Sequence, residues 1–284
     1  MCRSAQPYPN AYEHSQCTFL NVTSKQIIKI VHDNRAKKLP ELLKLMEQIK
    51  HEHIIKAIGL VCQFNKFSIR PVGYSTTYFE NESLDRYIIG DQLQLSIETI
   101  LQWVTQLTSA VAYLHDKEII HGDLKPANIL VGKSAQCIML NMSVNSLPGN
   151  CIISLKELRT DIAFKAPECL TFEADGHLGK TSDIWSFGMI LYFLLTKETP
   201  HKGLLVSVKD GTLQDFKIVK RMLQSDGIII PETPLKSLME DVLKWEPNER
   251  STINDIQMKL DNIRYTLMAH ETTIAINNSM LSFN

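Results

Sequence analysis

The chain has 284 residues, of which 44% are hydrophobic and 21% charged, and its formal net charge at pH 7 is −1. This composition is typical of a globular protein and excludes collagen-like, low-complexity and disordered chains. The near-zero net charge provides no global field that would attract nucleic acid or an anionic membrane, so we expect neither as a partner.

The N-terminal segment and the cysteines predict a cytoplasmic protein. The first 16 residues hold no apolar core of the kind found in signal peptides. The most apolar window, Trp185 to Leu195, is too short to span a bilayer. The six cysteines include no Cys-x-x-Cys pair, which argues against a zinc cluster and for reduced thiols.

The first third of the chain predicts strands and a single helix. After irregular polar residues at 1–15, the apolar run 26–31 has the length of a strand. Apolar residues then recur at helical spacing in 40–49, where Pro40 suits the first turn of a helix. The segments 54–64 and 66–79 are predicted as strands, because they are bounded by turn residues.

Long helices dominate after residue 81. Apolar residues recur with a period near 3.6 in 97–115, and further helices are predicted at 180–195, 213–224, 234–245 and 253–267. Residues 268–284 show no clear period and are predicted to form a tail. The fold class is therefore α+β, with a small β-rich N-lobe at 16–80 that contains one helix, and a larger helical C-lobe at 81–267. The junction of two such lobes is the natural cleft.

Five short signatures follow one another between residues 78 and 253. They are YFENESLDRYI at 78–88, HGDLKPANIL at 121–130, FKAPECL at 164–170, KTSDIWSFGMILY at 180–192 and EPNERSTI at 246–253. The chain therefore resembles the eukaryotic protein kinase family, in the style of its tyrosine-kinase-like members, over roughly residues 26–267. The resemblance implies the bilobal protein kinase fold.

Four residues in these signatures are expected to hold the fold rather than to run a reaction. The resemblance implies an ion pair between Glu168 and Arg250, and loss of one partner would leave a buried charge at a cost of about 3–5 kcal/mol. Asp183 would accept hydrogen bonds from the backbone of the catalytic loop, and Trp185 would pack in the core.

Phosphoryl transfer requires positioned phosphates, neutralised charge and an oriented hydroxyl. The resemblance makes Asp123 the catalytic base, Lys125 a cation on the transferring phosphate and Asn128 a metal ligand. The family usually has Arg before the catalytic Asp, where this chain has Gly122. The alternative is that this loop only buttresses the fold.

Five further positions match the nucleotide pocket of the family. Lys29 would contact the phosphates of the nucleotide, unless it is an exposed strand lysine of no consequence. Ile27 would narrow the adenine pocket, because the family usually has Ala there. Thr76 matches the gatekeeper position, Tyr78 the hinge, and Leu130 the position beneath the adenine.

The metal site departs from the family pattern. Asn141 lies 18 residues after Asp123, which is the family's spacing to the first residue of Asp-Phe-Gly. A neutral amide therefore stands where a carboxylate should bind Mg²⁺, a hard cation that prefers charged oxygens. Met142 replaces the Phe and can still fill an apolar slot, whereas Ser143 replaces the Gly.

The N-lobe departs as well. The first glycine of the chain is Gly59, so no glycine-rich loop precedes Lys29, and the segment CTFLNVTSKQ at 17–26 cannot form the usual phosphate flap. The helix position expected for the glutamate partner of this lysine holds Leu42 rather than Glu41. One residue turns a helical side chain by about 100°, so the ion pair is predicted to be missing or distorted.

The departures fall on nucleotide and metal handling, whereas the fold-holding residues match the family. We therefore interpret the chain as a pseudokinase that binds a protein partner, with another kinase as the first candidate. At most it would bind ATP weakly or without metal, with Mg²⁺ binding weak or absent. The alternative is a divergent Ser/Thr protein kinase that transfers the ATP γ-phosphate with Asp123 as base. A third hypothesis is a nucleotide-sensing scaffold that needs no metal.

Overall fold

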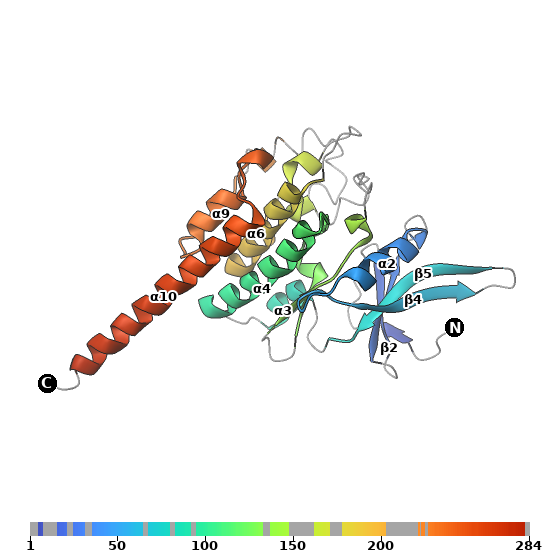
Figure 1. The fold of residues 1–284 in the computed structure, drawn as a ribbon, viewed down its shortest axis with the longest axis horizontal. Helices are drawn as coiled ribbons and strands as arrows, with labels where there is room; N and C mark the ends of the chain where they lie inside the picture. Colours follow the sequence, from blue (N-terminus) through green and yellow to red (C-terminus); the bar gives the residue numbers. More distant parts are fainter. Residues whose placement is uncertain are drawn as a thin grey trace.

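The fold was analysed in a computed structural model. It describes residues 5–7, 16–21, 25–31, 36–64, 68–79, 83–91, 95–132, 137–147, 162–170, 178–202, 221, 223–224 and 227–281. A sheet-rich N-lobe and a helical C-lobe lie next to each other, which confirms the predicted α+β protein kinase architecture (Figure 1).

The N-lobe is a five-stranded antiparallel sheet with strand order β1-β2-β3-β5-β4. Its strands are β1 (Ala5–Pro7), β2 (Gln16–Asn21), β3 (Gln26–Val31), β4 (Ala57–Phe64) and β5 (Ile69–Thr77). The strand predicted at 26–31 is confirmed with the same bounds, and β4 and β5 lie inside the segments predicted for them.

One expectation for the N-lobe was wrong. Residues 1–15 were expected to be irregular, yet β1 lies there and pairs with β2. Residues 8–15, which connect these two strands in the chain, lie outside the described residues. Residues 17–26 instead belong to β2, the following turn and the start of β3. The segment 8–15 also contains no glycine.

The helix α2 (Leu39–Gln48) begins at a proline-containing first turn, as the sequence predicts. It packs against β4 and β5 through a buried face that contains Leu42 and Met46. Glu41 lies on the exposed face of the same helix. The apolar side chains of α2 must face the sheet, and this sets the rotation of the helix about its axis. The same rotation turns Glu41 away from the sheet.

The C-lobe is built from five described helices and a small hairpin. The helices are α3 (Leu84–Asp91), α4 (Ile97–Asp116), α6 (Lys180–Thr196), α9 (Lys236–Val242) and α10 (Ile253–Leu281). The strands β6 (Ile129–Val131) and β7 (Ile138–Leu140) pair with each other. Short 3₁₀ turns lie between them, namely η1 (Pro126–Asn128), η3 (Val144–Ser146), η4 (Ile162–Phe164), η5 (Pro167–Cys169) and η6 (Pro247–Glu249).

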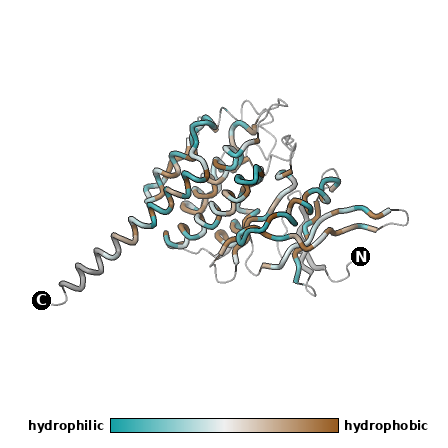
Figure 2. The backbone as a smooth tube through the Cα atoms, in the orientation of Figure 1, coloured by the Kyte–Doolittle hydropathy of each residue, from teal (hydrophilic) through white to brown (hydrophobic). Residues whose placement is uncertain are grey.

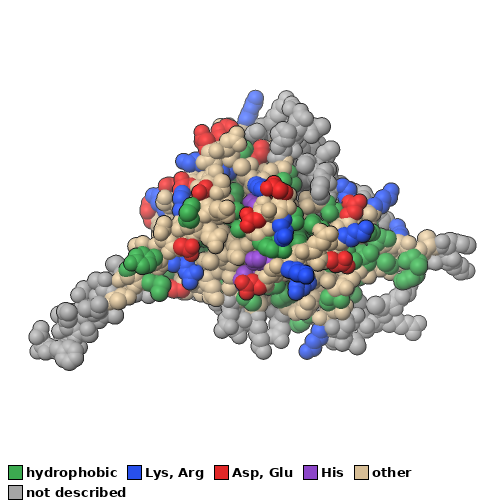
Figure 3. Space-filling model, viewed as in Figure 1, with side chains coloured by type: hydrophobic (Ala, Val, Ile, Leu, Met, Phe, Trp, Pro, Cys, Tyr) green, Lys and Arg blue, Asp and Glu red, His purple; other side chains and the backbone are tan. Residues whose placement is uncertain are grey.

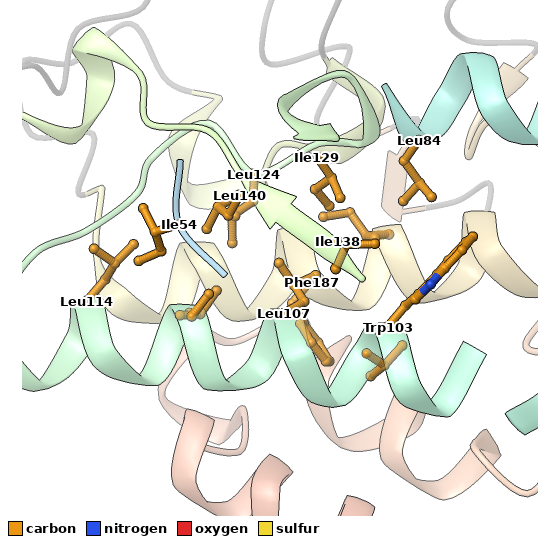
Figure 4. Close-up of a cluster of buried hydrophobic side chains, with 14 of the residues drawn as sticks. Ile54, Leu84, Trp103, Leu107, Leu114, Leu124, Ile129, Ile138, Leu140 and Phe187 are labelled. Atoms are coloured by element: carbon orange, nitrogen blue, oxygen red, sulfur yellow. The ribbon is translucent and has the colours of Figure 1, made fainter. Parts of the chain in front are cut away.

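The core of the C-lobe lies between α4, α6 and the β6–β7 hairpin. Leu107 on α4 lies beside Phe187 on α6, Leu114 lies farther along α4 next to Ile54, and Ile129 and Leu140 from the hairpin complete the cluster (Figure 4). These side chains are all buried. Figure 2 shows the same concentration of apolar residues at the centre of this lobe.

Two boundaries in the C-lobe require comment. The helix predicted at 253–267 continues to Leu281, and its far end extends beyond the other helices (Figure 1). The helix predicted at 213–224 lies mostly outside the described residues. Within the described part of the chain, no helix combines the length and apolarity needed to cross a membrane.

The two lobes are joined by backbone hydrogen bonds between the loop after α2 and the strand β7. The amide of Ile55 donates to the carbonyl of Leu140 at 2.8 Å, and the amide of Leu140 donates to the carbonyl of His53 at 2.8 Å. Residue 141, which follows β7 directly, therefore lies immediately beneath the N-lobe.

The outer end of the N-lobe carries exposed apolar side chains. Phe64 and Ile69 are neighbours across β4 and β5, and they are 72% and 66% exposed. They lie near the end of the hairpin that extends to the right in Figure 1, where Figure 3 shows apolar side chains on the surface.

Candidate active site

The loop at 121–125 is held in place from below by Asp183. Its carboxylate accepts hydrogen bonds from the backbone amides of His121 at 2.8 Å and Gly122 at 2.9 Å. His115 lies 3.0 Å from the same carboxylate. The predicted role of Asp183 is confirmed. It is a structural role, because the carboxylate fixes the path of the backbone that carries Asp123.

Gly122 occupies a position that suits glycine. Its φ angle is +70°, in the left-handed region that side chains with a Cβ rarely adopt. A Cβ there would also approach a methyl group of Leu178 to 2.6 Å. The replacement of the family's Arg by Gly is therefore accommodated by the packing around the loop.

Asp123 is buried and engaged through both carboxylate oxygens. Asn128 donates to its Oδ2 at 2.9 Å and to its backbone carbonyl at 2.8 Å. Its Oδ1 lies 3.4 Å from the ammonium of Lys125 and 3.2 Å from that of Lys165. The three residues predicted for catalysis are thus brought together, with a fourth that the sequence analysis did not single out.

Lys165 is the residue that the sequence analysis missed. Its side chain is 7% exposed, and its Nζ donates to the carbonyl of Gly122 at 2.7 Å as well as contacting Asp123. It stands directly before Ala166-Pro167-Glu168. The sequence did offer a signal for Lys165, because a lysine next to a signature that is expected to be buried should itself be buried. A buried lysine almost always has a charged or polar partner.

The charge balance around Asp123 fixes its protonation state. Burial alone would raise the pKa of Asp123, but the ammonium groups of Lys125 and Lys165 outweigh it and hold the pKa well below its usual range. The hydrogen bond from Asn128 acts in the same direction. The carboxylate is therefore a weak proton acceptor, whereas a general base works best with a pKa near the operating pH.

Asn141 is held by a hydrogen-bond chain to the N-lobe. Its Nδ2 donates to the hydroxyl of Tyr74 at 3.3 Å, and that hydroxyl donates to the carbonyl of Met142 at 3.1 Å. Burial raises the pKa of Tyr74 to about 12, so the hydroxyl stays protonated and remains a donor. Asn141 Oδ1 is buried and has no hydrogen-bond partner among the described residues. Met142 is buried, as expected of an apolar replacement for Phe.

Lys29 lies on the sheet above this group. It is 8% exposed and pairs across β3 and β5 with Tyr74, so the hypothesis of an exposed strand lysine is wrong. Burial, together with the positive charge of Lys125, lowers the pKa of Lys29 to about 8 against the opposing charge of Asp123. Within the described residues, no carboxylate forms an ion pair with it. The pair with Glu41 is missing, as predicted.

The remaining predicted pocket residues lie on β3, β5 and β6 and just beyond the end of β5. Ile27 and Thr76 are buried neighbours across β3 and β5. The amide of Tyr78 donates to the carbonyl of Lys25 at 3.1 Å, which continues the sheet beyond β5. Leu130 is half-buried on β6. Their roles toward an adenine ring remain expectations from the resemblance.

The ion pair predicted between Glu168 and Arg250 is present and bidentate. The guanidinium nitrogens lie 2.6 and 2.9 Å from the two carboxylate oxygens. Arg250 also donates to the backbone carbonyls of Thr181, Lys244 and Trp245. This contact fixes the end of the activation segment against the helices of the C-lobe.

A small β-lobe above a helical lobe, with an Asp-Lys-Asn group at their junction, defines the protein kinase class. The sequence model of the protein kinase domain matches residues 14–260, so the chain belongs to the protein kinase domain family.

Relatives among characterised proteins carry kinase names. The chain is 28% identical over 238 residues to mitogen-activated protein kinase kinase kinase zak-1 of Caenorhabditis elegans, covering 78% of this chain and 29% of that protein. It is 29% identical over 218 residues to serine/threonine-protein kinase ppk34 of Schizosaccharomyces pombe, covering 75% and 58%. It is 27% identical over 222 residues to putative mitogen-activated protein kinase kinase kinase 7-like of Drosophila melanogaster, covering 75% and 52%. The chain thus spans 29% to 58% of the lengths of these three relatives.

The family generally binds ATP with Mg²⁺, and the residues here do not fit the metal. The two side chains at the expected metal positions, Asn128 and Asn141, are neutral amides. The adjacent carboxylate of Asp123 already contacts two ammonium groups. No group of three or more His, Cys, Asp or Glu side chains suited to a metal is found within the described residues. Mg²⁺ keeps water ligands and binds through one or two carboxylates plus phosphates, and such a free carboxylate is missing from this donor set.

Proposed function

We propose that this kinase domain is a pseudokinase, which works by binding a protein partner and biasing its conformation. The observation that carries the proposal is the engagement of Asp123. Its Oδ1 lies beside two ammonium groups and its Oδ2 accepts from Asn128. These contacts stabilise the ionised carboxylate and weaken it as a base for a substrate hydroxyl. The neutral Asn141 removes the carboxylate that a metal would need.

A distinction between two sets of residues also supports a non-catalytic role. The contacts that hold the fold, from Asp183 to the catalytic loop and from Arg250 to Glu168, are complete. The departures fall on the phosphate flap, the partner of Lys29 and the metal carboxylate. Loss confined to nucleotide handling is what a binding module would tolerate. Another kinase is the first candidate partner, and we expect neither nucleic acid nor membrane to be one.

A divergent Ser/Thr kinase is the competing function. It is favoured by the presence of Asp123, Lys125 and Asn128 together, and by the relatives named as serine/threonine-protein kinase or kinase kinase kinase. In that case Lys165 would have to leave Asp123 when substrate binds.

Phosphoryl transfer distinguishes the two functions. Purified protein should show no autophosphorylation and no transfer to generic protein substrates with ATP and either Mg²⁺ or Mn²⁺, because Asp123 is a weak base and Asn141 supplies no carboxylate for the metal. The measurement is incorporation of labelled phosphate, and Asp123→Asn is the control for contaminating kinases. Transfer that exceeds the level of Asp123→Asn would refute the pseudokinase proposal.

A further inference from the structure

The strand β4 lies at the edge of the N-lobe sheet. It pairs with β5 on one side, and the described residues place no strand on its other side. Between Gly59 and Phe64 the residues of β4 follow one another without an insertion, because the irregularity after Val61 is an extra residue on β5, Val72. Along such an edge, every second residue presents both its N–H and its C=O outward. The outer edge of residues 59–64 is therefore a continuous row of backbone donors and acceptors.

This edge lacks the features that usually protect an exposed strand. Edge strands are normally blunted by charged side chains, by proline or by bulges. The segment AIGLVCQF at 57–64 contains no charged residue and no proline, and its one extra residue, Ile58, lies before the continuous stretch. Apolar side chains are exposed instead, since Ile58 is 52% exposed, Leu60 36% and Phe64 72%. An apolar edge of this kind is suited to bind another strand.

The exposed side chains favour an extended ligand with apolar residues at alternate positions. Leu60, Cys62 and Phe64 share one face of the sheet, because successive side chains of a strand point to opposite faces. Ile69 lies opposite Phe64 on β5 and is 66% exposed, so the apolar surface continues across the two strands. Figure 3 shows hydrophobic side chains along this hairpin. A strand beside β4 would place its own alternate side chains against Leu60 and Phe64.

The charge around the edge indicates an acidic partner. Residues 53–79 contain no Asp or Glu, although the whole chain has a net charge of −1. The basic residues in this segment are Lys56, Lys66 and Arg70. Lys56 is exposed directly before β4, and Arg70 donates to the side chain of Gln63 on β4 at 2.8 Å. Positive charge thus lies at both ends of the edge. A second copy of the chain would bring like charges together, which disfavours pairing of two β4 strands.

We infer that β4 binds an extended segment of a partner protein as a sixth strand of the sheet, and that this segment has alternate apolar residues flanked by acidic ones. Backbone hydrogen bonds to residues 59–64 provide the pairing, and the exposed apolar side chains provide the burial. The inference rests on the proposed partner-binding function, and it identifies the surface and the chemistry of the partner. A membrane is a poorer occupant, because lipid cannot satisfy the open backbone groups of β4.

Fluorescence anisotropy with labelled synthetic peptides tests the inference at constant ionic strength. The probe peptide has valine and threonine in alternation, with aspartates at both ends. One control peptide has the same sequence with its interior backbone amides N-methylated, and another has lysines in place of the aspartates. The probe peptide should bind. The N-methylated peptide should not bind, because it cannot donate to the edge, and the lysine peptide should bind more weakly because of charge repulsion.

Variants of the protein place the binding on β4. Phe64→Ala should weaken binding of the probe peptide by about tenfold, because an exposed aromatic side chain would be buried by the ligand. Tyr265→Ala is the matched control, since Tyr265 is an aromatic residue on α10 that is 76% exposed. It should leave the affinity unchanged. Lys56→Glu should weaken binding of the probe peptide and strengthen binding of the lysine peptide. Circular dichroism checks that each variant is folded.

The outcomes separate this inference from the proposed function. Absence of binding, or binding that survives N-methylation or Phe64→Ala, would overturn the inference alone, whereas labelled phosphate transfer would overturn the pseudokinase proposal. Two further measurements identify other occupants. A dimer in sedimentation experiments that is lost in Phe64→Ala would assign the edge to a second copy of the chain. Binding to phosphatidylserine vesicles that is lost in Phe64→Ala would assign it to a membrane, and either result would overturn the inference.

Discussion

At the scale of single residues, sequence reasoning located the altered metal position but not the groups that surround it. The distance of 18 residues from Asp123 identified Asn141, because the number of residues between two positions can be read directly from the sequence. The hydrogen-bond chain through Tyr74 depends on β5 lying over the end of β7, and the contact of Lys165 with Asp123 joins residues 42 apart. Neither contact is encoded in a local pattern.

Asn141→Asp tests the metal position directly. A carboxylate cannot donate to the hydroxyl of Tyr74, so that hydroxyl would have to turn from Met142 or leave a buried charge unpaired. We expect the variant to lose about 1–3 kcal/mol of stability in EDTA. Mg²⁺ with ATP should recover this loss, by an amount that rises with the logarithm of the ligand concentration above Kd.

The same variant should not gain turnover. Lys165 would still engage Asp123, and residues that act as one phosphate-handling unit are strongly non-additive. Thermal unfolding with and without Mg²⁺ and ATP is the measurement, with labelled transfer in parallel. Robust transfer from Asn141→Asp alone would show that Lys165 does not block the base. Indifference to Mg²⁺ would show that the pocket is closed for other reasons, with Ile27 the first suspect.

At the scale of elements, the helices that face the core could be predicted closely and the periphery could not. The helix predicted at 180–195 is α6, which ends one residue later. It could be predicted closely because almost all of its side chains are buried, so the sequence there is a continuous apolar run. The strand β1 was missed because a three-residue strand is defined by its pairing with β2 rather than by its own side chains. The extension of α10 beyond 267 was missed because the sequence there has no apolar period, although no Gly or Pro interrupts the helix.

The link between the activation segment and the C-lobe predicts a large effect of one substitution. Arg250→Met should lower the free energy of unfolding by about 3–5 kcal/mol, because it leaves the carboxylate of Glu168 without its partner. It also removes three hydrogen bonds to backbone carbonyls. Urea unfolding followed by far-ultraviolet circular dichroism gives the measurement.

Lys180→Met is the matched control, since Lys180 and Glu118 form an ion pair at the surface. Exposed pairs contribute roughly 0–1 kcal/mol, so this variant should unfold close to the wild-type midpoint. Equal losses in the two variants would mean that the bidentate pair with Glu168 does not stabilise the fold more than a surface contact does.

At the scale of the whole molecule, the two lobes keep the architecture of a kinase while their junction has changed its chemistry. The structure confirms the predicted bilobal fold. The fold could be predicted because its sequence pattern is spread over many apolar residues, so that the pattern does not depend on any one of them. The chemistry of the junction depends on a few charged groups from separate segments, among them Lys29, Asp123 and Lys165. The fold was therefore predictable from the sequence as a whole, and the electrostatics of the site required the assembled structure.

The projecting helix α10 gives the last prediction. Its first half belongs to the core, since Ile256 and Leu260 are fully buried, whereas Met268 is 65% exposed where the helix extends beyond its neighbours (Figure 1). Leu260→Ala should therefore cost about 2–5 kcal/mol, because it leaves a cavity against the packed helices. Met268→Ala should change stability by no more than about 0.5 kcal/mol, as is usual for an exposed position. Chemical unfolding of both variants is the measurement, and a large loss in Met268→Ala would reveal that the second half of α10 is covered in solution.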